Sequence, residues 1–369
     1  MLCRAVFSWK LYIDDVEIPS FSDLKISYAM NGIGTSGVLT GTMSFKTYYK
    51  AISGNAFPWC SVVKLICNDE TITVPEFYVR NRTVEEDITL WDCSDKMGKT
   101  DEPVEFSDAY FIDEKISSEN VLSLCALTCQ FDSYAFAGNG TDILSKIGNI
   151  SQSLVVGKTV REILDMYATA MCGYWVCDAK NKLIFTPFGT AYYGTTLNCH
   201  AQIIEGGTRT YTKVIMYNGD EIYTSGEGNA RETLMISTPL ASQELCSAVC
   251  ASICNVTYTS WSCENGLSSY YFYPGDIFFS DAEVRFCTSV TLYPSAVGIF
   301  FSAEATNVSE DEYAYVNQVN RQLKRKLELD VRNGNMAITK KGIKIFANKN
   351  ESDISEESTT VISVFKSEE

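Results

Sequence analysis

The sequence predicts a mainly β fold with an α+β insert, and three observations lead to this prediction. Tyr and Phe together outnumber Leu, which suits half-buried strands. Apolar and polar residues alternate in short runs, such as the one containing Leu39, Met43 and Phe45, and turn residues separate these runs. One central stretch instead follows the period of a helix. We therefore expect β-barrel domains on both sides of a smaller α+β domain.

The central stretch, residues 159–185, predicts a helix followed by a β-hairpin. Thr159 and Glu162 have the spacing of a capping box, and Gly173 is expected to end the helix. Apolar residues follow at helical period: Val160, Ile163, Leu164, Tyr167, Ala168 and Met171. Residues 174–177 and 183–185 then read as two strands joined by a tight turn. The apolar helix face should pack on a sheet.

We expect four domains. Residues 1–104 form a first β-barrel domain, residues 105–200 an α+β domain, residues 201–305 a second β-barrel domain, and residues 306–369 a C-terminal segment. The strands expected in the first barrel are residues 5–13, 23–28, 61–67, 77–82 and 88–93. The α+β domain adds a helix over residues 117–129 to the helix and hairpin described above.

The second barrel is expected to contain an inserted helix over residues 241–254. Its expected strands are residues 203–204, 211–217, 221–224, 233–236, 277–279, 284–290 and 297–303. The C-terminal segment should contain a helix over residues 312–329 and a hairpin from residues 336–338 and 343–346. The acidic stretch of residues 350–360 is expected to be loosely ordered.

The net charge of −16 argues against a protein that grips nucleic acid, because neutralising phosphates requires clustered Lys and Arg. The dense basic run, Arg321 to Lys326, is expected to complement the dipole of a helix. No segment has the roughly 18–20 consecutive apolar residues of a membrane span, and the N-terminus lacks a signal-peptide core. We therefore expect the 14 cysteines to be reduced thiols made in a cytosol.

Thiol and imidazole groups offer few candidates for chemistry. His200 is the one histidine and follows Cys199, and adjacent side chains rarely point the same way. Cys246, Cys250 and Cys254 share one helical face, so a thiolate metal site is conceivable, but packing in the core is favoured. We favour the same interpretation for the pair of cysteines at positions 125 and 129.

Clustered carboxylates are also weak candidates. A glycosidase needs two carboxyl groups at a defined separation, but clusters such as Glu85 to Asp87 and Asp113 with Glu114 are usually solvated turns. The sequence contains no P-loop, dinucleotide fingerprint, nucleophile elbow or zincin motif. We therefore name no catalytic, cofactor-binding or metal-binding residue, and we expect a protein without a cofactor that is not an enzyme.

The order of several short segments resembles the hub proteins of phage tails and phage-like injection machines. These segments are F-Y-V-R-N-R-T at 77–83, the loop from W-D-C-S-D-K-M to D-E-P-V at 91–104, T-V-R-E-I-L at 159–164, K-L-I-F-T-P-F at 182–188, S-T-P-L at 237–240 and Y-P-G-D at 273–276. The resemblance covers most of the chain. It implies two tail-tube-like β-barrels in each subunit of a homotrimer, so that six barrels form a ring matching the hexameric tail tube.

The resemblance also implies partners and a location. The hub would join the tail tube or a distal tail protein to a spike, fibre or other baseplate protein at the virion tail tip, after assembly in the host cytoplasm. A tape measure protein is a further partner, and DNA would pass only as cargo. The acidic composition fits, because carboxylates lining a lumen repel DNA phosphates. Since the chain ends soon after Phe365, a bare hub is expected, with any lysin or receptor-binding part on another polypeptide.

A protein of another class remains an alternative. A carbohydrate-binding or host-surface recognition β protein would use aromatic side chains, and a peptidoglycan hydrolase is a less favoured variant of it. The tryptophans available for such a surface are Trp9, Trp59, Trp91, Trp175 and Trp261. In β proteins, tryptophans more often lie in a core or an interface.

Overall fold

The structure is a computed structural model. It describes residues 7–29, 37–48, 58–69, 72–188, 196–198, 200–254, 257–268, 270–274, 277–280, 283–305, 336–339, 342–345 and 360–362. The chain forms two compact units, Met1–Val308 and Ser309–Glu369. The expected division into four domains is finer than this partition and stays a prediction.

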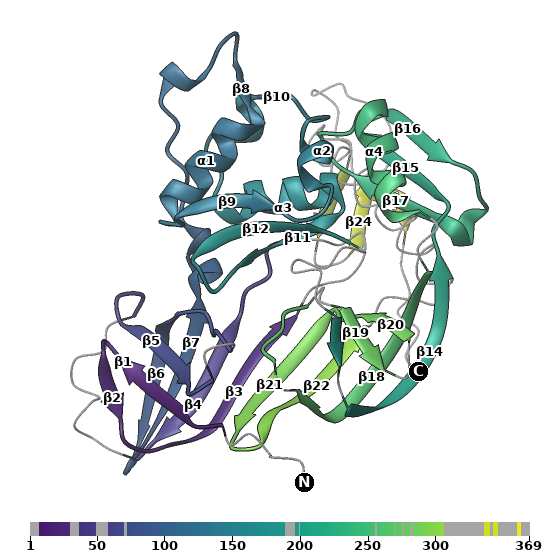
Figure 1. Cartoon of the computed structure of the whole chain (residues 1–369). Helices are drawn as coiled ribbons and strands as arrows, with labels where there is room; N and C mark the ends of the chain where they lie inside the picture. Colours follow the sequence, from purple (N-terminus) through teal and green to yellow (C-terminus); the bar gives the residue numbers. More distant parts are fainter. Residues whose placement is uncertain are drawn as a thin grey trace. The chain divides into compact units, whose positions relative to one another are not determined.

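A sheet of 11 strands is the largest element of the first unit (Figure 1). Its strands in spatial order are β14 (His200–Thr210), β18 (Thr257–Ser268), β22 (Gly298–Ala305), β21 (Ser289–Ser295), β3 (Phe21–Ala29), β4 (Thr42–Thr47), β7 (Ile88–Asp95), β6 (Phe77–Glu85), β5 (Val62–Cys67), β1 (Trp9–Ile13) and β2 (Val16–Ile18). Burial alternates along the strands, as in β3, where Leu24, Ile26 and Tyr28 face the core. The prediction of a mainly β fold is confirmed.

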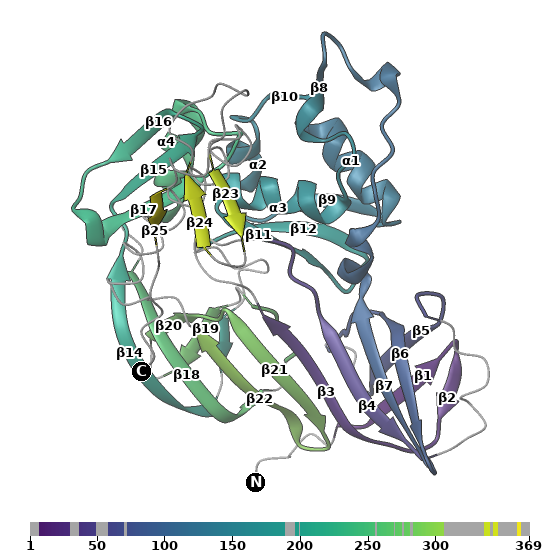
Figure 2. The ribbon, with the colours of Figure 1, turned by 180° about the vertical axis from the view of Figure 1, so that it is seen from behind.

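Strands from both ends of the first unit meet in this sheet. Strand β21 pairs antiparallel with β3, with Ser289 opposite Ala29 and Leu292 opposite Ile26. Leu292 and Ile26 are fully buried, and on the other face the hydroxyls of Ser27 and Thr291 lie 3.2 Å apart. Both views show β21 beside β3 (Figures 1 and 2). Strands that were expected in two separate barrels therefore belong to one sheet, which the pairing of β3 with β21 makes continuous. We call this pairing the β3–β21 seam.

The predicted helix and hairpin are confirmed. Helix α3 (Val160–Met171) begins with a complete capping box, in which Thr159 and Glu162 each bond the other's backbone N–H. The left-handed residue that ends it is Cys172, with φ of 53°, and not Gly173. Gly173 begins β11, where an added Cβ would collide with the Phe185 ring and the Thr186 carbonyl. The glycine is needed for the close approach of two strands.

This α+β part of the first unit has its own small sheet. Its other elements are α1 (Ser118–Thr128), β9 (Ser133–Phe136), α2 (Gly140–Leu144), β11 (Gly173–Cys177) and β12 (Lys182–Pro187). Strand β12 pairs antiparallel with β11 and parallel with β9, and α3 contacts both α1 and β11. The helix expected over residues 117–129 is thus confirmed as α1, with Ser117 as its N-cap.

Three strands that were expected in the second barrel form a separate small sheet. Strands β15 (Lys213–Asn218), β16 (Glu221–Gly226) and β17 (Thr233–Ser237) make up this sheet, and helix α4 (Gln243–Ile253) contacts β15 and β16. The helix expected over residues 241–254 is confirmed. Its apolar face packs on β15 and β16.

Two expectations in this region were wrong. Residues 257–268 form the long strand β18, which the sequence analysis did not include. Residues 284–290, expected to be one strand, divide between β20 (Glu283–Phe286) and β21. The break falls at Cys287, whose thiol donates to the Ser289 carbonyl at 3.0 Å. Strand β20 joins a small sheet with β13 (Thr196–Asn198) and β19 (Ile277–Ser280), so the two halves of the expected strand enter different sheets.

Short elements complete the first unit. They are the strand pair β8 (Lys115–Ser117) and β10 (Asn149–Ser151), and the 3-10 helices η2 (Lys96–Asp101), η3 (Asp108–Tyr110), η4 (Gln152–Leu154) and η5 (Ala230–Glu232). Among the described residues, no helix combines the length and apolar character needed to cross a membrane.

In the second unit, β23 (Met336–Thr339) and β24 (Gly342–Ile345) form the expected hairpin, and β25 (Thr360–Ile362) pairs with β24. The helix expected over 312–329, its basic run and the acidic residues 350–359 lie outside the described residues.

Candidate functional site: a polar junction at helix α3

A short segment before β4 connects the large sheet to the α+β part. Val38 forms an isolated parallel bridge with Trp175 of β11. The Leu39 N–H donates to the Trp175 carbonyl at 2.8 Å, and the Trp175 N–H donates to the Gly37 carbonyl at 3.0 Å. Residues 37–39 therefore extend the small sheet by one bridge before the chain enters the large one.

Helix α3 fixes this segment through a half-buried carboxylate. Asp165 Oδ1 accepts a hydrogen bond from the Val38 N–H at 2.8 Å. Burial raises the pKa of Asp165, and the bond from Val38 opposes that rise. An added Cβ on Gly37 would lie 2.6 Å from the same oxygen, so a larger residue at this position would have to displace the Asp165 carboxylate.

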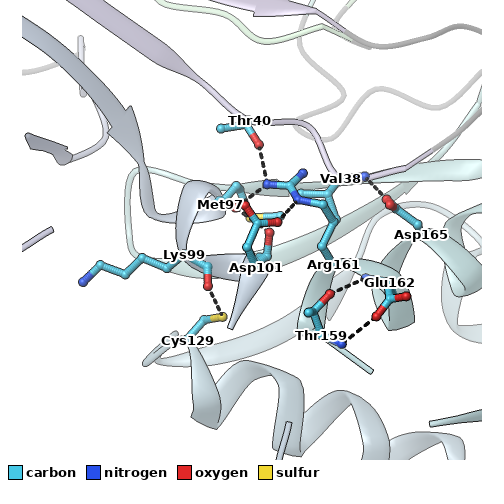
Figure 3. A network of polar contacts seen from close by, with 11 residues as sticks. Val38, Thr40, Met97, Lys99, Asp101, Cys129, Thr159, Arg161, Glu162 and Asp165 are labelled. Atoms are coloured by element: carbon cyan, nitrogen blue, oxygen red, sulfur yellow. Dashed lines mark hydrogen bonds and ion pairs between the residues drawn. The ribbon is translucent and has the colours of Figure 1, made fainter. Parts of the chain in front are cut away.

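Arg161, one turn earlier on α3, bonds to η2 and to the segment before β4 (Figure 3). We call the polar contacts that join α3, η2 and this segment the polar junction. Its Nε donates to Asp101 Oδ1 at 2.6 Å, and its Nη2 donates to the Met97 carbonyl at 3.3 Å and to Thr40 Oγ1 at 3.4 Å. The side chain of Asp101 is 73% exposed, so solvent screens this ion pair and its contribution is at most about 1 kcal/mol. The main role of Arg161 is to connect α3 with η2 and with the segment before β4.

Asp95, the last residue of β7, organises the centre of the junction. It is fully buried, and its carboxyl accepts from the Gly41 N–H at 2.9 Å and from the Met97 N–H at 3.1 Å. It thereby caps η2 and holds the residue before β4. Burial raises the pKa of Asp95 to about 8, although these backbone bonds and the charge of Arg161 oppose the rise.

Lys96 extends the junction to the far end of the small sheet. Its ammonium donates to the Gln130 carbonyl after α1 and to Asn181 Oδ1 at 2.8 Å in the β11–β12 turn. Asn181 in turn donates to Asp132 at 2.8 Å. Burial lowers the pKa of Lys96. Lys96 is only 7% exposed, and oxygen atoms in loops of the α+β part accept the hydrogen bonds of its ammonium group.

The junction is suited to mechanical connection rather than to chemistry. Its charged groups are directed at backbone groups and at one another within a packed region, as Figure 3 shows for Arg161 and Asp165. No nucleophile lies beside a general base in this described network. The arrangement joins the large sheet, η2 and α3 by hydrogen bonds.

Sequence reasoning did not single out these side chains, although a signal existed. Two of the segments that carry the family resemblance meet here, because Asp95 and Lys96 belong to W-D-C-S-D-K-M and Arg161 belongs to T-V-R-E-I-L. The two segments lie about 65 residues apart in the sequence. Their contact could therefore not be inferred from the sequence and becomes visible only in the folded structure.

A second feature is a depression of about 490 Å³ on the large sheet. It is lined by Ile204, Ser262, Cys263, Glu264, Asn265, Ser289, Thr291, Ser302, Ala303 and Glu304. Hydroxyls and two carboxylates dominate this lining. No aromatic side chain is among these residues, whereas sugar-binding surfaces commonly stack sugars on aromatic rings.

The thiol and imidazole candidates do not assemble into a site among the described residues. Cys199 lies outside the described residues, and His200 is placed only as the start of β14. Cys246 and Cys250 are buried residues of α4, and Cys254 is half-buried. The pair at positions 125 and 129 is also buried. In the part of the chain that the structure describes, no group of three His, Cys, Asp or Glu side chains could hold a metal ion.

The carboxylate clusters lie in exposed turns. Glu85 ends β6, Glu86 and Asp87 form the turn between β6 and β7, and Asp113 with Glu114 lies in the turn before β8.

The tryptophans mostly lie inside the protein. Trp91, Trp175 and Trp261 are buried, Trp9 donates to the Ser295 carbonyl at 2.9 Å, and Trp59 is covered by the guanidinium of Arg80. Three of the five tryptophans considered for a carbohydrate-binding surface are thus used in packing.

Structural comparison places this fold among known ones. The prophage tail protein gp18 of Listeria monocytogenes EGD-e is 13% identical, with a TM-score of 0.52, and the match covers 85% of this chain and 99% of that one. The tail protein of Neisseria meningitidis MC58 is 9% identical, with a TM-score of 0.50, over 81% of this chain and 96% of that one. The chain has the fold of a phage tail protein.

Both matches extend over nearly the full length of the two tail proteins and over more than four fifths of this chain. The 43 kDa tail protein of prophage MuSo2 from Shewanella oneidensis is also similar, at 9% identity and a TM-score of 0.49, over 81% of this chain and 98% of that one. No protein-family model and no curated protein matches the sequence.

Proposed function

We propose that the protein is a structural hub at the distal end of a phage or phage-like tail. Three copies form a ring in which each contributes two tube-like β parts, so that a threefold protein meets a sixfold tail tube. The observation that carries this proposal is the β3–β21 seam in a chain with the phage-tail fold. The seam sets strands from both β regions side by side in one sheet, as a subunit with two tube-like parts requires.

The role is structural rather than catalytic. The polar junction at α3 supports this view, because its charges brace the α+β part against the sheet and leave no nucleophile poised among its described residues. In the proposed ring, the α+β part would face the baseplate or spike. The partners are the tail tube or a distal tail protein on one side, a spike, fibre or other baseplate protein on the other, and a tape measure protein in the lumen.

DNA is cargo in this proposal. The net charge of −16 and the two glutamates of the sheet depression favour a lumen that repels phosphate. An assembled ring should therefore have an electronegative inner surface. A strongly basic inner surface in a structure of the ring would contradict this part of the proposal.

The native mass tests the ring directly. Light scattering on a sizing column should give about three times the 41.1 kDa protomer, at a concentration well above micromolar. If the chain is a monomer, the same measurement is repeated after mixing with its tail tube protein, because assembly can depend on the partner. A chain that stays monomeric in both measurements would overturn the trimeric hub.

A further inference from the structure

Helix α4 ends with two cysteines whose sulfur atoms nearly touch. Cys250 lies in the last turn and Cys254 is the C-cap residue, and their Sγ atoms are 3.2 Å apart. The Cys254 N–H donates to the Cys250 carbonyl at 2.9 Å, so the last helical turn holds both residues. A disulfide has an S–S distance of about 2.05 Å. Small rotations of the two side chains can close the remaining gap.

The neighbouring atoms favour this pair over any other pairing on the helix. Cys246, one turn earlier, directs its thiol to the Val214 carbonyl at 3.5 Å and the Tyr223 carbonyl at 3.6 Å, so the small sheet engages it. Cys250 packs at the end of β16, where an added Cβ on Gly226 would lie 3.0 Å from its sulfur. Cys254 is half-buried, so it is the member of the pair that a reagent can reach.

We propose that Cys250 and Cys254 are a reversible dithiol–disulfide site that a small disulfide such as oxidised glutathione can oxidise. The Cys254 thiolate attacks one sulfur of the oxidant, whose S–S bond breaks as one glutathione leaves. The Cys250 thiolate then attacks the Cys254 sulfur of the mixed disulfide, and the second glutathione leaves. Two cysteine thiols are oxidised, one glutathione disulfide is reduced, and the two cysteine protons end on the two glutathione thiols.

The site should react slowly near neutral pH. Burial raises the pKa of Cys254 to about 12, and its hydrogen bond with Cys250 contributes to the rise. Since the thiolate is the attacking species, the oxidation rate should increase about tenfold for each pH unit below that pKa. The proposal does not depend on the role of the protein in a tail.

The chain contains its own control. Cys125 and Cys129 have the same spacing at the end of α1, and both are buried. The thiol of Cys129, however, is directed at the Lys99 carbonyl at 3.5 Å. If proximity of the sulfurs decides the outcome, this pair stays reduced while Cys250 and Cys254 react.

The test uses the full folded chain with excess oxidised glutathione at two pH values one unit apart. Free thiols are then alkylated, and the chain is cleaved after glutamate, which releases residues 245–264 for tandem mass spectrometry. We expect a disulfide within this peptide that joins Cys250 and Cys254, formed about tenfold faster at the higher pH, and both thiols at positions 125 and 129 alkylated.

Variants separate the pairings. Cys246→Ser should retain the disulfide, and Cys254→Ser should lose it while its circular dichroism stays that of the wild type. If Cys250 and Cys254 remain alkylated in the folded wild type, or if the pair at 125 and 129 oxidises as readily, the proposal is overturned. Because the wild-type measurement decides this alone, a variant that fails to fold does not rescue the proposal.

Discussion

Asp95 shows how one buried residue can link stability to pH. An aspartate in an unfolded chain titrates near pH 3.9. In the folded protein, burial raises the pKa of Asp95 to about 8. Between these values the folded state holds a proton that the unfolded state has released. The stability contributed by this group is therefore fully present below about pH 4 and is lost as pH rises through about 8.

Replacing Asp95 by Asn should remove this dependence, because the amide is neutral at every pH. At about pH 5 we expect Asp95→Asn to cost about 1–3 kcal/mol, since one of two buried backbone bonds loses its acceptor. Toward about pH 8 the wild type should lose up to about 1.4 kcal/mol per pH unit relative to the variant. Urea unfolding at a series of pH values measures the difference.

Asp92 provides the matched control, because it lies on the same strand but is exposed. We expect Asp92→Asn to follow the wild type at each pH. If Asp95→Asn also followed the wild type throughout, Asp95 would not carry the proton that we assign to it.

At the scale of elements, the sequence predicted a helix or hairpin correctly where all of its signals lie within one short stretch of chain. The capping box and apolar period of α3 lie within one stretch of chain, so the sequence predicted both the helix and the hairpin after it. Strand β18, which was not expected, contains Asn265 and Gly266, a dipeptide that is typical of a turn. In the fold they form a bulge instead, where Asn265 has a φ of 58° and Gly266 lies under the ring of Phe301.

The cap of α3 can be tested by one substitution. Thr159→Ala removes the oxygen that accepts from the Glu162 N–H at 3.2 Å, and we expect a loss of about 1 kcal/mol in the free energy of unfolding. Thr159→Ser, which keeps the hydroxyl, should stay close to the wild type. Equal losses in both variants would mean that the methyl group, and not the cap, supplies the stability. Denaturant titration followed by circular dichroism measures both.

At the scale of the whole molecule, the decisive contacts are distant in sequence. Nothing in residues 21–29 or 289–295 indicates that they pair, because neither segment carries a local signal that identifies its partner. The polar junction has the same character, since Arg161 and Met97 lie 64 positions apart. The mainly β character and most of the described elements could thus be predicted from the sequence, whereas the two-barrel architecture stays a prediction. The seam and the junction depend on tertiary packing and could not.

The seam should couple the two β regions energetically. Leu292→Ala removes a fully buried side chain opposite Ile26 and should cost about 2–5 kcal/mol. Hydrogen exchange should then accelerate in both β3 and β21. Leu234→Ala in the small sheet of β15 to β17 is the control, because its effect should be largest there. Unchanged exchange in β3 of Leu292→Ala would show that the two regions are stable independently.

The β3–β21 seam also sets the order of events during synthesis. Ala29 is synthesised about 260 residues before its partner Ser289. At about 5–20 residues per second, β3 therefore waits some tens of seconds with one edge unpaired. During that interval the nascent chain presents a strand edge that other chains can add to. Overexpression should thus favour aggregation of unfinished chains, and slower initiation, which keeps them dilute, should increase the yield of folded protein.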